Sequence, residues 1–78
     1  MTSKMQKLMI DLERVIAPHY EWRAFSKAIM HHKAIHSAGP EMLLAATKHL
    51  VWYHGQDMDS VDLPTFIRQV VKWIKGDQ

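Results

Sequence analysis

The sequence contains no cysteine, and this absence excludes several classes of small protein at once. Disulfide-stapled scaffolds, zinc sites built from thiolates and cysteine nucleophiles all require that residue. Glycine and proline are also scarce, with three of each among 78 residues, while 47% of the residues are hydrophobic. This composition is typical of a folded globular domain and not of a disordered tail.

Long apolar runs are missing as well. No segment approaches the roughly eighteen consecutive apolar residues of a membrane span. The first 17 residues carry Asp11, Glu13 and Arg14, where a secretory signal peptide has an uninterrupted apolar stretch. We therefore expect a cytoplasmic protein without a membrane partner.

Net charge is low, at +2 with histidine neutral. Dedicated nucleic-acid binders usually carry a much larger positive charge. The charges are unevenly spread, with a net +3 over residues 1–37, −3 over residues 38–62 and +2 over residues 63–78. We expect these stretches to neutralise one another within a compact fold.

Apolar residues recur with a period of 3.6 almost throughout the chain, which predicts an all-α protein. The expected helices span residues 3–16, 20–37, 40–54 and 63–75. They form a compact bundle of four short helices, in a single domain over residues 1–78. The helix over residues 40–54 is apolar over most of its circumference, so we place it at the centre. Its apolar residues are Met42, Leu43, Leu44, Ala46, Leu50, Val51 and Tyr53.

Helix ends are marked by local signals. Ser3 followed by Gln6 is a capping-box pattern, which predicts the start of the first helix. Gly39 ends the second helix and Pro40 opens the third. Asp62 is suited to cap the last helix, because its carboxylate can accept a hydrogen bond from the first turn.

Histidines are concentrated in the sequence HHKAIH at residues 31–36. In a continuous helix over residues 20–37, His32 and His36 lie one turn apart on the apolar face, close enough to chelate Zn²⁺ or Ni²⁺. A zinc site needs further ligands, and spacing supplies none. His32 and His36 are therefore weak metal candidates, and we expect no metal or other cofactor.

Catalysis is not indicated by any motif. Asp57 and Asp59 match the start of a calcium loop, but Asp62 occupies the glycine position and Arg68 the closing glutamate position. No serine lies in a nucleophile elbow. A chain of this length also has little room for both a core and an enclosed substrate pocket. We expect that the protein is not an enzyme.

A basic row of Arg68, Lys72 and Lys75 recurs at i, i+4 and i+7 on the last helix. Such a row can contact phosphates, although the solvated face of any amphipathic helix looks similar. The helix after the SAGPE turn is too apolar to read bases in a major groove. Nucleic-acid association through this row is therefore the alternative function.

Two large apolar residues lie where solvated side chains are expected. Trp52 is on the polar strip of the helix over residues 40–54, and Met30 is on the polar side of the preceding helix. Both residue types are favoured at protein interfaces. The competing interpretation is that Trp52 covers a seam between packed helices.

We therefore expect a non-enzymatic protein-binding module that acts by occlusion of a larger partner, or through self-association as a homodimer. The expected partner contacts are Met30, Trp52, Arg68, Lys72 and Lys75.

The segment IHSAGPEMLLAATKHLVWYH, residues 35–54, has a run of small residues leading into Pro-Glu-Met-Leu and then an alanine-containing helix. The residues of this pattern are Ala38, Pro40, Glu41, Met42, Leu43, Ala45, Ala46 and Lys48. The segment resembles a stretch found in small phage and prophage proteins. That resemblance implies a phage accessory protein, a class that often binds a host protein stoichiometrically. It implies no activity and no particular binding residues.

Overall fold

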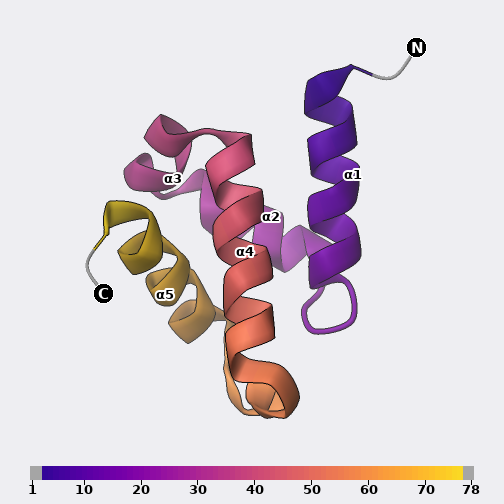
Figure 1. Ribbon diagram of the computed structural model, residues 1–78, viewed down its shortest axis with the longest axis vertical. Coiled ribbons are helices and arrows are strands. Elements are labelled where there is room, and N and C mark those ends of the chain that lie inside the picture. The colour runs from indigo at the N-terminus through magenta and orange to yellow at the C-terminus, as the bar shows by residue number, and fades with distance from the viewer. Residues whose placement is uncertain (1–2, 77–78) are drawn as a thin grey trace.

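The computed structural model describes residues 3–76 of the single domain expected over residues 1–78 (Figure 1). Its elements in chain order are α1 (Lys4–Ile16), α2 (Trp22–Met30), α3 (Lys33–Ala38), α4 (Pro40–His54), the 3-10 helix η1 (Gly55–Ser60) and α5 (Leu63–Lys75). Residues 3–76 contain no strand, which confirms the predicted all-α class. The predicted bounds of the first, third and last helices agree with α1, α4 and α5 to within one residue.

Local capping explains this agreement. At the start of α1, the Ser3 hydroxyl accepts a hydrogen bond from the Gln6 backbone N–H at 3.1 Å, and the Gln6 side chain accepts one from the Ser3 N–H at 3.0 Å. At the start of α5, Asp62 Oδ1 accepts a hydrogen bond from the Thr65 N–H at 2.9 Å. Hydrogen bonding to Thr65, through its side chain and then its backbone N–H, lowers the pKa of the Asp62 carboxyl below its ordinary value, because it stabilises the charged form.

The prediction of one continuous helix over residues 20–37 is wrong. The chain leaves the helical conformation at His31 and His32, so that α2 ends at Met30 and α3 begins at Lys33. The backbone of His32 is extended, with φ −110° and ψ 111°. Neither glycine nor proline is present at this break.

Burial explains the break. In a continuous helix the imidazole of His36 would lie near the middle of the apolar face, and Ile35 would lie toward the edge of that face. In the folded chain Ile35 is only 5% exposed, whereas His36 is exposed. The His36 ring also donates through Nε2 to the carbonyl of Met30 at 3.0 Å, at the end of α2 where carbonyls lose their helical partners. The break thus buries an aliphatic side chain in place of an imidazole.

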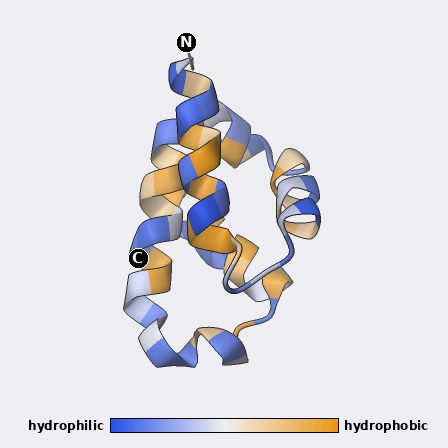
Figure 2. Ribbon diagram, turned by 90° about the vertical axis from the view of Figure 1, so that its right-hand side faces the viewer, coloured by the Kyte–Doolittle hydropathy of each residue, from blue (hydrophilic) through white to orange (hydrophobic). Residues whose placement is uncertain are grey.

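The hydrophobic core draws on every helical element. Its buried members are Leu12, Ile16, Phe25, Ile29, Ile35, Leu43, Ala46, Leu50, Met58, Phe66, Ile67 and Val70. Figure 2 shows hydrophobic residues concentrated toward the middle of the bundle. Helix α4 borders α1, α3, α5 and η1, as expected of the central helix. Helix α2 instead lies beside α1, α3 and α5, so only the α3 part of the predicted second helix borders α4.

Tyr20 connects the segment between α1 and α2 to the segment before α5. Its hydroxyl donates a hydrogen bond to the carbonyl of Val61 at 2.6 Å, and its ring centroid lies 5.3 Å from that of Phe66. Partial burial raises the pKa of the Tyr20 phenol above its ordinary value of 10.0, and the nearby charge of Asp62 raises it further. The folded state therefore favours the neutral phenol.

This preference predicts a loss of stability in alkaline solution. A phenol whose pKa is higher in the folded state than in the unfolded state stabilises the fold below pH 10, and this contribution is lost as the pH rises through the folded-state pKa. We expect the free energy of unfolding to fall more steeply above pH 10 in the wild type than in a Tyr20→Phe variant. Urea denaturation at several pH values between 8 and 11 measures this difference. Parallel curves for the two proteins would contradict the prediction.

Candidate functional site

The five predicted contact residues occupy three different surfaces. Trp52 is in the C-terminal half of α4, and Met30 is the last residue of α2. Arg68, Lys72 and Lys75 lie together along α5. The structure therefore keeps the basic row together and separates it from Met30 and Trp52.

The first surface, the aromatic face, consists of His49, Trp52 and Tyr53 from α4 and Trp73 from α5. Trp52 and Tyr53 are 74% and 69% exposed. The ring centroid of His49 lies 5.9 Å from that of Trp52, 6.5 Å from that of Tyr53 and 5.6 Å from that of Trp73. One imidazole thus lies among three aromatic rings and joins the two helices.

The exposure of Trp52 follows from how α4 is packed. The buried side chains of this helix, which face the core, are Leu43, Ala46, Thr47 and Leu50. Trp52 lies on the opposite side of the helical wheel, where no other element covers it. An exposed fraction of 74% is incompatible with the interpretation in which Trp52 covers a seam between helices. The prediction that its ring projects into solvent is confirmed.

Tyr53 is a further aromatic residue of this face that the sequence pattern does not single out. Its apolar ring was grouped with the packing residues of the central helix, whereas the structure leaves it nearly as exposed as Trp52. A signal was available, because Tyr53 directly follows Trp52 and lies one turn after His49, which is polar. Met42, which was also grouped with the packing residues, is 41% exposed.

The second surface, the methionine groove, has a volume of about 340 Å³ and lies between α1, α2, α3 and the start of α4. Met5, Met9 and Met30 line it together with Ile35 and Leu43. Met30 is 67% exposed, as its position on the polar side of the helix predicts. Unbranched, polarisable methionine side chains make such a surface adaptable to differently shaped apolar groups.

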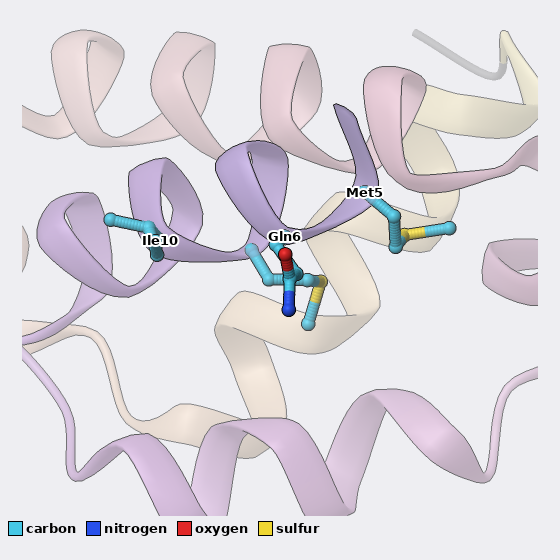
Figure 3. Close-up of a pocket in the computed structure, with 4 residues that line it drawn as sticks. Met5, Gln6 and Ile10 are labelled. Atoms are coloured by element: carbon cyan, nitrogen blue, oxygen red, sulfur yellow. The ribbon is translucent and has the colours of Figure 1, made fainter. Parts of the chain in front are cut away.

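A neighbouring hollow of about 480 Å³ lies along α1 and is lined by Met5, Gln6, Met9 and Ile10. Figure 3 shows Met5, Gln6 and Ile10 on the ribbon of this helix. Because all four lining residues belong to one helix, the hollow is a surface depression and not an enclosed pocket. Residues from a second element would be needed to surround a small ligand.

The third surface, the basic groove, has a volume of about 310 Å³ and is lined by His32, Arg68, Val71, Lys72 and Lys75. The break between α2 and α3 brings His32 next to the basic row of α5, a proximity that spacing along the chain does not reveal. The Arg68 guanidinium donates through Nη2 to the Thr65 hydroxyl at 3.1 Å. This hydrogen bond fixes one end of the row.

The cations of the basic groove are not neutralised by ion pairs with other residues in the range 3–76. Across the part of the chain that the structure describes, the single ion pair joins Lys4 to Glu41, with Nζ and Oε1 2.7 Å apart. Both of those side chains are mostly exposed, and they belong to α1 and α4. Arg68, Lys72 and Lys75 therefore have no ion-pair partner among residues 3–76.

The histidine pair does not form the centre of a metal site in this fold. His36 uses Nε2 in its hydrogen bond with the Met30 carbonyl, whereas His32 lines the groove beside α5. Among residues 3–76, no group of three or more histidine, aspartate or glutamate side chains is placed to hold a metal ion. Asp57 and Asp59 are exposed on η1, whose buried residue is Met58.

Comparison of the chain with protein-family models, with curated proteins and with solved structures gave no match. Within residues 3–76, no helix combines the length and the apolar character that crossing a bilayer requires. The longest of these helices, α4, has 15 residues, fewer than the roughly 20 needed. Because the comparisons gave no match, a function for this chain has to be inferred from its three surfaces.

Proposed function

We propose that this protein is a small, non-enzymatic binding module that recognises another protein through its aromatic face. The observation that carries the proposal is the exposure of Trp52 and Tyr53, at 74% and 69%, on adjacent residues of the central helix. Tryptophan and tyrosine are the side chains most often found at interface positions that dominate binding free energy. Large apolar surface is otherwise removed from water during folding.

The surroundings of Trp52 favour binding by a preformed surface. His49 lies beside the rings of Trp52, Tyr53 and Trp73, and this packing would limit the rotamers of these side chains before a partner arrives. Ordering side chains at an interface costs about 0.5–1.5 kcal/mol for each flexible group, and this cost is reduced when the groups are held in advance. The proposed mechanism is occlusion, in which this rigid face covers a surface of the partner.

The proposed partner is a larger cytoplasmic protein. The resemblance of residues 35–54 to small phage proteins supports this choice, because proteins of that class often bind a host protein stoichiometrically. Self-association through the same face is part of the proposal, since two exposed tryptophan–tyrosine pairs are able to cover each other in a symmetric dimer.

A second candidate function is association with nucleic acid. The observation that favours it is the groove in which the cations Arg68, Lys72 and Lys75 lie together beside His32. Binding to phosphates would show a steep dependence on salt concentration. A gel shift with random duplex DNA at low salt tests this candidate, and an absence of any shift would exclude it.

The main proposal predicts that Trp52→Ala weakens association with the partner and leaves the stability of the fold nearly unchanged. Because the side chain is largely exposed, we expect the free energy of unfolding to change by less than about 0.5 kcal/mol. We expect affinity for the partner to fall by about 2 kcal/mol or more, which is roughly 30-fold. The partner is first captured on immobilised protein from a lysate, then purified and titrated by calorimetry. Sedimentation of the chain alone measures self-association.

Met30→Ala is the matched control, because it removes another large side chain that is 67% exposed, from a different surface. We expect it to bind the partner as the wild type does. Binding that is lost with Met30→Ala and retained with Trp52→Ala would place the contact in the methionine groove and overturn the proposal. A loss of more than 2 kcal/mol of stability in Trp52→Ala would assign that residue to the fold.

A further inference from the structure

The basic groove continues into a second, apolar hollow. This extension, of about 390 Å³, lies between α2 and the start of α5, and its apolar lining consists of Ala28, Leu63, Pro64 and Ile67. Its remaining lining residues, His31, His32 and Arg68, include two that also line the basic groove. The two hollows therefore form one path along α5, which is apolar near the start of the helix and cationic near its end.

Charge along this path has one sign. Among residues 3–76, the cations Arg68, Lys72 and Lys75 line it, no acidic side chain does, and none of the three has an ion-pair partner. Among residues 3–76, the acidic group nearest to Arg68 in the sequence is Asp62, which accepts a hydrogen bond from the Thr65 N–H and also interacts with the charge of Arg68. The position of the three cations is complementary to an occupant that is anionic at one end.

We propose that this path binds an acidic peptide segment with an aliphatic anchor, supplied by the protein that the aromatic face recognises. The inference rests on the proposed function, because it names the chemistry of the partner. Leucine or isoleucine of the segment would fill the apolar extension, and aspartate or glutamate would lie against the basic groove. From Leu63 to Lys75 the helix rises about 18 Å, which matches an extended segment of about six residues.

The lining favours a peptide over a nucleic acid. Single-stranded nucleic acids bind by stacking their bases on aromatic rings alongside cations. Apart from the imidazoles of His31 and His32, the described lining of the two hollows contains no aromatic ring, and the ring of Trp73 packs instead against His49 of α4. Leu63, Pro64 and Ile67 offer nothing to a phosphate backbone, whereas they match an aliphatic side chain.

A synthetic peptide tests the inference directly. The probe is a fluorescein-labelled ten-residue peptide that carries two leucines followed by four glutamates, and binding is measured by fluorescence anisotropy at 50 and 300 mM salt. Two matched probes replace the glutamates by glutamine or the leucines by serine, and labelled oligo(dT) serves as a polyanion without an aliphatic anchor. We expect the leucine–glutamate peptide to bind at least tenfold more tightly than any of the other three. We also expect its affinity to fall at the higher salt concentration.

Charge-matched variants locate the binding site. Lys72→Gln/Lys75→Gln removes two charges from the groove, and Lys7→Gln/Lys48→Gln removes two exposed charges from α1 and α4. We expect the groove variant to weaken peptide binding by on the order of tenfold and the control variant by less than twofold. Amide NMR shifts caused by the peptide should fall on α5 and on residues around His32.

Three results would overturn the inference. Tighter binding of oligo(dT) than of the peptide would show a nucleic-acid groove. Equal binding of the glutamine peptide would show that the cations contribute nothing, and equal weakening by both variants would show a general effect of net charge. Trp52→Ala should leave peptide binding unchanged. A failure of the peptide proposal can therefore be distinguished from a failure of the proposed function of the aromatic face.

Discussion

Replacing Phe66 with alanine is expected to lower the free energy of unfolding by about 3–5 kcal/mol. Phe66 is fully buried, and its ring centroid lies 5.3 Å from that of Tyr20 and 6.4 Å from that of Phe25. The truncation removes the contacts of α5 with both rings and leaves a cavity that the surrounding helices can only partly close. Because a domain of 78 residues has a total stability of about 4–12 kcal/mol, the variant would lose a large part of its stability.

Urea denaturation followed by circular dichroism measures the effect. With a slope of about 1 kcal/mol per molar urea for a small domain, the midpoint should fall by about 3–5 M. Tyr53→Ala is the control, since it also removes an aromatic ring from a helix but from a position that is 69% exposed. We expect the control to change stability by less than about 0.5 kcal/mol. A loss below 1 kcal/mol for Phe66→Ala would show that the ring is not part of the core.

Local signals in the sequence were sufficient for most helix ends, because capping acts within a few residues. The Ser3–Gln6 box and the Asp62 cap both form as predicted. The break at His31–His32 has no such signal, since it arises from competition between Ile35 and His36 for a place in the core. That competition is decided by packing against α4 and α5, which lie later in the chain. The helical periodicity of residues 20–37 does not reveal the break, because periodicity describes one segment and not its packing against later helices.

In the candidate site, too, some features follow from the local sequence and others depend on tertiary packing. The exposure of Trp52 and Met30 follows from helical periodicity alone, and both are exposed in the structure. The approach of His32 to Arg68 depends on the helix break, and the contact of His49 with Trp73 depends on how α4 meets α5. Periodicity thus predicts the exposure of Trp52 and Met30, whereas the exposure of Tyr53 and the grouping of residues into an aromatic face and a basic groove depend on the tertiary fold.

Gly39→Ala is expected to destabilise the protein by about 1–3 kcal/mol, although the added methyl group meets no atom within 4 Å. Gly39 has φ 89° and ψ 169°, a conformation essentially restricted to glycine. Its N–H donates to the carbonyl of Ile35 at 3.2 Å, and its own carbonyl accepts from the N–H of Leu43 at 3.1 Å. One residue therefore ends α3 and begins α4, so the angle between these helices depends on its backbone.

Two comparisons isolate backbone strain from other effects of substitution at Gly39. Gly76 has φ 79° and ψ 11°, a left-handed helical conformation that asparagine also adopts, so Gly76→Asn should destabilise the protein by less than 1 kcal/mol. Gly39→Asn should be as harmful as Gly39→Ala, because asparagine does not relieve strain outside the left-handed helical region. A chemically synthesised chain with D-alanine at position 39 should be as stable as the wild type, since positive φ is the ordinary region for a D-residue. Equal losses with L- and D-alanine would attribute the effect to the side chain and contradict the prediction.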